Sequence, residues 1–154
     1  MQKQSSKNIV FSTLDKLAKW SQRSSLWPLY LDLGCCGVEI MATVSQFNLD
    51  CLGTGIFCGS PRHADVLIVS GTVTLKMATR VRRLYDQMAE PKYVIAVGGC
   101  AISGGPYWQH GYHVLKGVDQ ILPVDVYVPG CPPIPEAMIE GIIALQEKIQ
   151  VKLK

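Results

Sequence analysis

The sequence predicts an α/β fold, with an open and mostly parallel sheet covered by helices on both faces. Continuous apolar runs, such as residues 65–70, are typical of strands that are buried on both sides. Between these runs lie segments whose apolar residues recur at helical spacing, such as residues 75–88. Strands that alternate with helices indicate a parallel sheet, because each helix carries the chain back to the start of the next strand.

The same patterns give the order of the elements. Strands are expected over residues 27–33, 65–70 and 93–97, and within 121–128. Helices are expected from Ser12 to about Ser25, from Val38 onward, over 75–88 up to the stop at Pro91, and from Pro135 onward. Residues 48–64 and the glycine-rich, aromatic segment 101–117 are expected to be loops. This alternation of elements is typical of a flavodoxin-like sheet.

A chain of 154 residues suits one domain. We expect residues 1–8, which are polar, to be a disordered tail, and residues 9–154 to form the domain. The domain begins with an amphipathic helix, because Ser12 and Asp15 have the spacing of a capping box and Leu14 and Leu17 continue an apolar stripe.

The composition limits the possible partners and the compartment. Charged residues make up 18% of the chain, below the ~25% of ordinary soluble domains, so we expect permanent partner subunits to cover part of the surface. The net charge is +3, but the cations are too few and too little mixed with aromatic residues for a nucleic-acid binder. No apolar run is long enough to span a bilayer, and no signal-peptide core is present, so we expect a cytoplasmic location with reduced thiols.

Four of the six cysteines follow predicted strands. Cys35 and Cys36 come after the first strand, Cys100 after the third and Cys131 after the fourth. Ligands of open α/β sheets bind beyond the carboxyl ends of the strands, where these thiols are expected to meet. Four thiolates are the usual ligands of a cubane iron–sulfur cluster.

Spacing alone leaves three other interpretations of these cysteines open. Structural zinc usually uses cysteine pairs two to four residues apart, and the set contains no such pair. A catalytic cysteine needs a base, but the three histidines stand in no recognisable motif, and buried cysteines can also be inert. Cys51 and Cys58 match no ligand pattern. Adjacent ligands diverge in any regular backbone, so Gly34 and Gly37 are expected to permit unusual torsions around the pair.

Several motifs, in order, resemble one known family. They are Leu26-Trp27-Pro28-Leu29 followed by Gly34-Cys35-Cys36, Ser60-Pro61-Arg62, Gly71-Thr72-Val73-Thr74, Gly98-Gly99-Cys100, and Val128-Pro129-Gly130-Cys131-Pro132-Pro133. The chain resembles the B subunit of respiratory NADH–quinone oxidoreductase, complex I, from about Phe11 to Lys148. It departs from the usual family residues at Cys58, His63 and Ile134.

The resemblance implies a single cofactor, a [4Fe–4S] cluster that Cys35, Cys36, Cys100 and Cys131 would hold. The protein would be an electron-transfer subunit that reduces quinone within a proton-pumping oxidoreductase and is not catalytic alone. Relatives driven by coenzyme F420 or ferredoxin share this subunit and stay open as alternatives. A different class, a structural metal or interaction subunit without a redox role, also stays open.

The resemblance also implies partners and further site residues. The partners would be the D, C and I subunits and the H subunit of the membrane part, with the chain peripheral to the cytoplasmic face of the cell membrane. Trp27, Val38 and Met41 match positions that line a quinone pocket, and their apolar side chains suit a hydrophobic ring and tail. Glu39, between the cysteine pair and Met41, is expected to take up a proton when an electron arrives.

Overall fold

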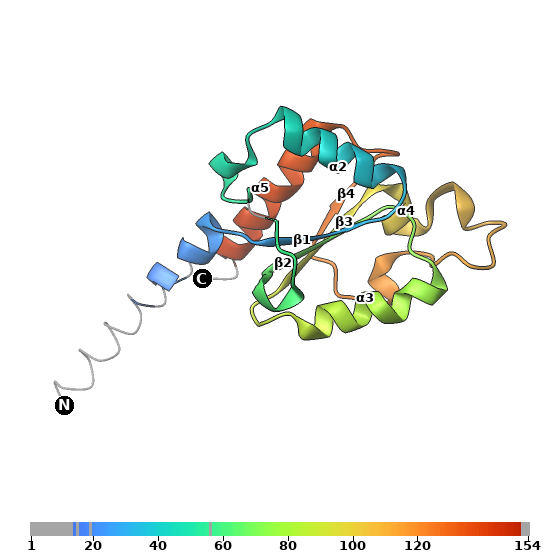
Figure 1. Ribbon diagram of the computed structural model, residues 1–154, viewed down its shortest axis with the longest axis horizontal. Coiled ribbons are helices and arrows are strands. Elements are labelled where there is room, and N and C mark those ends of the chain that lie inside the picture. The colour runs from blue at the N-terminus through green and yellow to red at the C-terminus, as the bar shows by residue number, and fades with distance from the viewer. Residues whose placement is uncertain (1–13, 15, 19, 56, 152–154) are drawn as a thin grey trace.

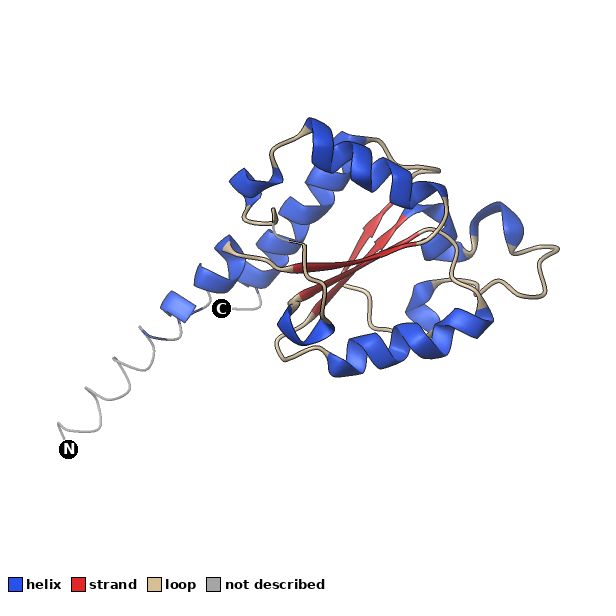
Figure 2. Ribbon diagram, in the orientation of Figure 1, coloured by secondary structure: helices blue, strands red, loops and turns tan. Residues whose placement is uncertain are grey.

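Parallel strands form the centre of the molecule (Figure 2). The computed structural model describes residues 14, 16–18, 20–55 and 57–151. Within that part of the chain, the sheet has four strands in the order β1-β2-β3-β4, and each neighbouring pair is parallel. The strands are β1 (Pro28–Asp32), β2 (Val66–Ser70), β3 (Tyr93–Val97) and β4 (Val126–Val128). The open, parallel α/β sheet expected from the sequence is confirmed.

The two inner strands are completely buried, as their apolar runs predict. All five residues of β2 and all five of β3 are shielded from solvent, whereas β1 and β4 at the edges are partly exposed. The register sets Val66 beside Tyr93 and Ser70 beside Val97. The carboxyl ends of neighbouring strands therefore finish level with one another.

Helices cover both faces of the sheet (Figure 1). On one face α2 (Cys35–Gln46) and α5 (Pro135–Val151) pack against each other and against the strands. Ile40 and Leu145 lie in the core on this side. On the other face lie α3 (Leu75–Gln87) and the short α4 (Gly98–Ser103), with Val81 and Ala101 in a second core. Alternate residues of β1, β2 and β3 contribute to the two cores, because side chains in a strand point to opposite faces.

Local chemistry fixes the ends of the helices. The Thr74 side chain accepts a hydrogen bond from the Met77 N–H and caps α3, and the chain leaves α3 before Pro91. α5 begins at Pro135, as expected, and its predicted stripe is buried. The residues of that stripe are Met138, Ile142, Leu145 and Ile149.

Three expectations about loops and helix starts need correction. The first helix after β1 begins at Cys35 rather than at Val38. The segment 101–117 is not all loop, because α4 extends to Ser103 and a 3₁₀ turn follows over Gly105–Tyr107. Residues 48–64 contain the 3₁₀ turns η1 (Leu49–Leu52) and η2 (Pro61–His63). Short turns of this kind have no apolar period, so the sequence pattern missed them.

The amino-terminal helix is present in the part that the structure describes. Residues 14, 16–18 and 20–24 are helical, which agrees with an end near Ser24. Leu14, Leu17 and Trp20 are exposed. The predicted cap at Ser12 and the tail 1–8 lie outside the described residues. None of the helices in the described residues is long and apolar enough to cross a membrane.

Candidate metal centre

Three turns meet at the carboxyl edge of the sheet. Backbone hydrogen bonds tie them: the Gly99 N–H donates to the Gly130 carbonyl at 2.7 Å, and the Leu33 N–H donates to the Ser70 carbonyl at 2.9 Å. The Gly71 N–H donates to the Val97 carbonyl at 3.2 Å. These bonds hold the chain after β1, after β3 and after β4 at one edge. All four cysteines that the sequence singled out lie in these segments, either in the turn itself or in the first turn of the helix that follows.

The tandem cysteines are the first two residues of α2. Gly34, just before them, has φ +69°, a conformation that residues with a side chain rarely adopt. The unusual torsion expected near the pair is therefore confined to Gly34. Gly37 has a different role, since a Cβ there would lie 2.8 Å from the Cβ of Asp32. A small residue lets the first turn of α2 approach the end of β1.

The other two cysteines approach from β3 and β4. Cys100 lies in α4 and is buried, whereas Cys131 follows Gly130, at φ +145°, and is exposed. In the tandem pair, Cys36 is buried and Cys35 is exposed. The set therefore has two thiols within the protein and two at its surface, at one edge.

The electrostatics show that the other three cysteines act on Cys36. The pKa of Cys36 is raised to about 11, first by burial and then by the negative charge that Cys35, Cys100 and Cys131 can carry. Only 1% of Cys36 is exposed, which agrees with a large desolvation penalty. Thiolates at the four positions would repel one another, most strongly at the buried Cys36. The positive charge of an iron centre would offset that repulsion, so that the four cysteines could bind it as thiolates.

Glycines leave room beside the two buried thiols. A Cβ at Gly98 would lie 2.5 Å from the Cys36 sulfur, and a Cβ at Gly105 would lie 2.7 Å from the Cys100 sulfur. Both glycines have positive φ. Sequence reasoning did not assign these two residues to the site. The signal that could have found them is the placement of glycine pairs on both sides of Cys100.

The site does not have the geometry of a single-ion centre. Among the described residues, no three of His, Cys, Asp and Glu come together closely enough to hold one metal ion. A cube of four irons, by contrast, binds one thiolate at each iron, and so its ligands stand apart from one another. Four converging thiols with side-chain-free space beside the buried pair fit a cluster of that kind.

The predicted quinone-pocket residues come from two parts of the chain, α2 and the segment just before β1. Val38 and Met41 share one face of α2 and are 72% and 54% exposed. Trp27 precedes β1, so the whole strand separates it along the chain from the tandem cysteines. Glu39 is half-buried on α2, one turn after Cys35. The apolar surface of α2 beside the cysteines is therefore open to a partner.

The fold and the site together define an open α/β sheet with four thiols at its carboxyl edge. The family model for the NADH ubiquinone oxidoreductase 20 kDa subunit matches residues 34–145, which contain all four cysteines. The chain belongs to this family. It is therefore a subunit of an oxidoreductase complex.

Individual relatives agree with the family. The B subunit of the NADH-quinone oxidoreductase of Amoebophilus asiaticus is 63% identical over 146 residues, covering 94% of this chain and 91% of the relative. Among solved structures, a chain of the archaeal membrane-bound sulfane sulfur reductase, a respiratory membrane complex, superposes with a TM-score of 0.81 at 38% identity, over 87% of this chain and 75% of that one.

A more distant likeness concerns the fold alone. A chain of an NAD+-reducing [NiFe]-hydrogenase superposes with a TM-score of 0.59 at 19% identity, over 80% of this chain and 92% of that one. The open parallel sheet is therefore shared well beyond the family.

Proposed function

We propose that this chain holds one [4Fe–4S] cluster and passes electrons to quinone within a proton-pumping NADH-quinone oxidoreductase. The observation that carries the proposal is the convergence of Cys35, Cys36, Cys100 and Cys131 at one edge of the sheet. When bound, such a cluster accepts and releases one electron at a time. The name of the Amoebophilus relative supports the choice of reaction.

The residues of this chain have separate parts in the proposal. The four cysteines would bind iron as thiolates, and Gly98 and Gly105 would keep the space beside the buried sulfurs free. The exposed apolar side chains of Val38 and Met41 would contact the quinone ring or tail, with Trp27 completing the pocket together with the D subunit. The pocket is proposed at this interface because these side chains are exposed in the isolated chain.

Glu39 is proposed to take up a proton at its carboxylate oxygens. It lies on the same side of α2 as Cys35, one helical turn away, and negative charge gained nearby favours the protonated carboxyl. If so, the midpoint potential of the [4Fe–4S] cluster, measured in the intact complex, should fall as pH rises. Glu39→Gln should weaken this pH dependence. An unchanged slope in Glu39→Gln would remove Glu39 from this role.

The proposal places the chain among partner subunits at the cytoplasmic face of the cell membrane, peripheral to it. The partners proposed are the D, C and I subunits and the H subunit of the membrane part. Expressed alone, the chain should be poorly soluble or poor in iron, because exposed apolar side chains would lack their partners. A stable monomer that retains its iron in isolation would contradict this placement.

The test of the cluster uses the complex purified from membranes. Iron and acid-labile sulfide should be present, and electron paramagnetic resonance of the reduced complex should give a [4Fe–4S] signal that is absent in Cys100→Ser. Cys51→Ser is the matched control, since Cys51 is an exposed cysteine outside the three turns. Zinc in place of iron, or a signal that survives in Cys100→Ser, would contradict the proposal.

Two alternatives have distinct outcomes. In the first alternative the complex takes its electrons from another donor, such as coenzyme F420 or ferredoxin. The likeness to a chain of an archaeal respiratory complex with another name is compatible with that alternative. A flavin- and NAD-binding chain in the purified complex would decide for NADH. In the second alternative the chain is a structural subunit without a redox role. An unchanged rate of quinone reduction in an assembled variant without the cluster would decide for that class.

A further inference from the structure

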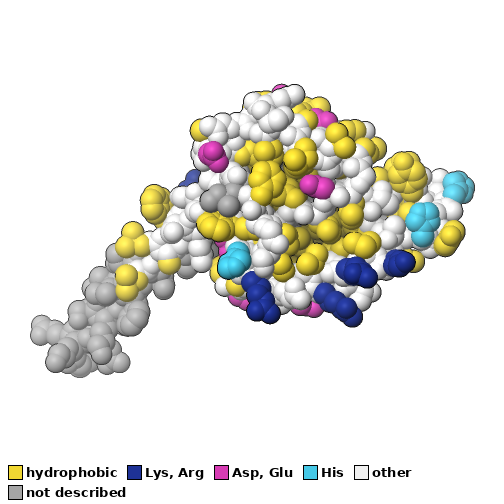
Figure 3. Space-filling model, viewed as in Figure 1, with side chains coloured by type: hydrophobic (Ala, Val, Ile, Leu, Met, Phe, Trp, Pro, Cys, Tyr) yellow, Lys and Arg dark blue, Asp and Glu magenta, His cyan; other side chains and the backbone are white. Residues whose placement is uncertain are grey.

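The outer face of α3 carries cations that the proposed function does not use. Lys76, Arg80 and Arg83 are exposed, and their spacing places them within an arc of about 60° on one side of the helix. Figure 3 shows Lys and Arg side chains gathered along the lower edge of the molecule, where α3 runs. Among the described residues, no acidic side chain forms an ion pair with any of these three.

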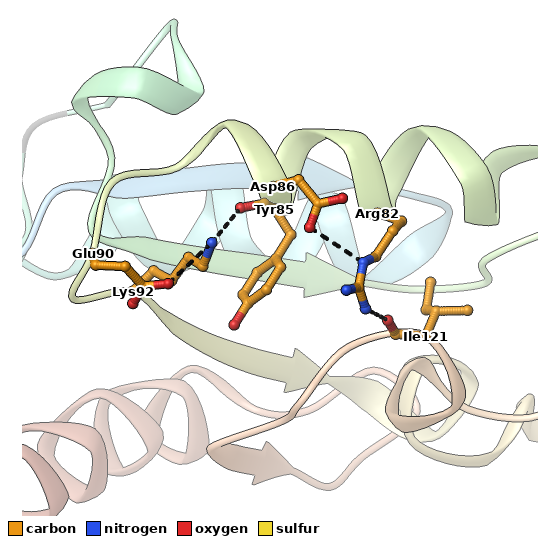
Figure 4. A network of polar contacts seen from close by, with 6 residues as sticks. All are labelled: Arg82, Tyr85, Asp86, Glu90, Lys92 and Ile121. Carbon is orange, nitrogen blue, oxygen red and sulfur yellow. Dashed lines mark hydrogen bonds and ion pairs between the residues drawn. The ribbon is translucent and has the colours of Figure 1, made fainter.

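The fourth cation of α3 is engaged within the chain. Arg82 forms an ion pair with Asp86 at 3.3 Å and donates to the Ile121 carbonyl at 2.8 Å (Figure 4). The ammonium of Lys92, the residue just before β3, lies 4.3 Å from the centre of the Tyr85 ring. These contacts fix the helix on the body of the protein. Lys76, Arg80 and Arg83 are exposed and can contact another molecule.

An aromatic hollow adjoins the beginning of this helix. The Leu75 N–H donates to the His113 carbonyl at 2.8 Å, and Thr74 pairs with Val114, so the loop that follows α4 is fixed to the start of α3. The hollow has a volume of about 530 Å³. The side chains that matter for its chemistry are Leu75, Trp108, Tyr112, Leu115 and Lys116.

The lining of this hollow is mixed: apolar and aromatic side chains alternate with polar ones, which include Gln109, His110 and Gln120. Tyr112 is 94% exposed, and the Lys116 ammonium lies 5.2 Å from the centre of the Trp108 ring. Exposed aromatic side chains beside cations are typical of the residues that dominate protein–protein binding. The loop with the hollow projects beyond the end of the sheet (Figure 1), so a partner can reach it.

We propose that α3 and this loop form a docking surface for another protein subunit. The partner would present an acidic surface to Lys76, Arg80 and Arg83, and would insert an apolar side chain into the hollow. A bilayer would meet the cations as well, but its flat surface cannot fill a concave hollow. The inference rests on the proposed place of the chain among partner subunits.

The first part of the experiment locates the partner. The photoreactive residue p-benzoylphenylalanine replaces Tyr112 in the full chain, within cells that assemble the whole complex. After irradiation, the crosslinked peptide is sequenced from the purified complex. We expect a peptide of another subunit with an excess of Asp and Glu. A crosslink to lipid, to a second copy of this chain or to a peptide without acidic excess, or no crosslink at all, would overturn the proposal.

The second part tests the charges. K76E/R80E/R83E should reduce the crosslink to background, whereas the matched control K76R/R80K/R83K, which keeps every cation, should retain it. Exchanging the acidic residues of the crosslinked peptide for Lys should restore the crosslink to the reversed variant. If the triple variant does not fold, R83E alone should still lower the yield. A yield that charge reversal leaves unchanged would overturn the proposal.

The docking surface and the proposed function can be disproved independently of each other. The iron and sulfide content of the wild-type complex tests the cluster and does not depend on α3. The crosslink tests the docking surface and does not depend on iron. A complex with iron but without a charge-dependent contact would overturn only the docking surface.

Discussion

The two helical layers of this protein differ in the chemistry of their outer surfaces. α3 carries four cations against Asp86 alone. α2 carries Glu39 as its only charge, and α5 carries three glutamates against Lys148, which is paired with Asp125 at 3.0 Å. The sheet thus separates a cationic layer from a layer that is acidic and, beside the tandem cysteines, apolar.

This difference indicates two kinds of partner contact. Beside the cysteines, the α2 surface exposes Val38 and Met41, where binding would come from burial of apolar area and would depend little on salt. On α3, charge attraction would set the rate and the specificity of association, and it weakens as salt rises. Two partners that bind through these different interactions would each recognise one side of the domain and not the other. Substitutions on one side of the sheet should therefore leave the other side unchanged.

The largest effect is expected at Gly98, beside the cysteines at the carboxyl edge of the sheet. Gly98→Ala should remove most of the iron, because the added Cβ would press on the Cys36 sulfur. Gly34→Ala is the control: it introduces a side chain at a similar positive φ, but no atom lies within 4 Å of the added Cβ. It should cost stability of about 1–3 kcal/mol yet keep the cluster. Iron analysis and thermal unfolding of both variants measure this. Equal iron loss in the two would mean that backbone strain alone is responsible.

The next effect concerns the core beneath the acidic layer. Leu145→Ala should lower the free energy of unfolding by about 2–5 kcal/mol, since Leu145 is 0% exposed and its loss opens a cavity between α5 and the sheet. Ile143→Ala, two residues earlier on the same helix and 39% exposed, should cost only about 0.5 kcal/mol. Urea unfolding of both variants gives the comparison. A similar cost at both positions would show that α5 is less firmly packed than its buried stripe indicates.

A smaller effect is expected at the apolar surface of α2. Met41→Ala should raise the Michaelis constant for quinone about fivefold, because losing roughly 1 kcal/mol of apolar contact changes binding by that factor. Since Met41 is more than half exposed, stability and iron content should not change. Steady-state kinetics of the purified complex measure the constant. Loss of iron with normal quinone kinetics would instead make Met41 a structural residue.

The fold class can be predicted from the sequence because the two inner strands are apolar and buried along their whole length. Residues 66–70 and 93–97 are buried on both sides, and a run of apolar residues is the direct signature of that burial. The buried stripe of α5 was equally clear. What the pattern missed was short and irregular: α4, η1 and η2 are too brief to show a period.

The placement of the four cysteines at one edge of the sheet could be predicted, but their surroundings could not. The cysteines were found because each follows a strand, and parallel strands end at one edge. The space at Gly98 and Gly105 depends on where two distant turns come together, which spacing along the chain does not reveal. The cationic side of α3 had a visible signal, Lys76, Arg80 and Arg83 at helical spacing, but only the structure shows that Arg82 turns inward.

The smallest effect is expected at the opposite edge of the sheet, at Asp65, just before β2. Burial raises the pKa of this carboxyl, and a hydrogen bond from the Trp27 N–H opposes the shift only in part. A carboxyl whose pKa is higher in the folded state stabilises the fold most below its unfolded pKa of about 3.9. That stabilisation is lost as pH rises through the folded pKa. At neutral pH the ionised Asp65 therefore costs stability.

Asp65→Asn cannot ionise and can still accept the hydrogen bond from Trp27. Its Tm should exceed that of the wild type by about 1–2 °C at pH 7, a small gain because Asp65 is only partly buried. The gain should vanish near pH 3, where the wild-type carboxyl is protonated in both states. Asp119→Asn, at an exposed carboxyl, controls for the change in net charge. A gain that persists at pH 3, or that Asp119→Asn reproduces, would mean that desolvation of Asp65 is not its cause. The cysteine edge and the α3 surface should be unaffected, because Asp65 lies at the amino-terminal edge of the sheet, away from both.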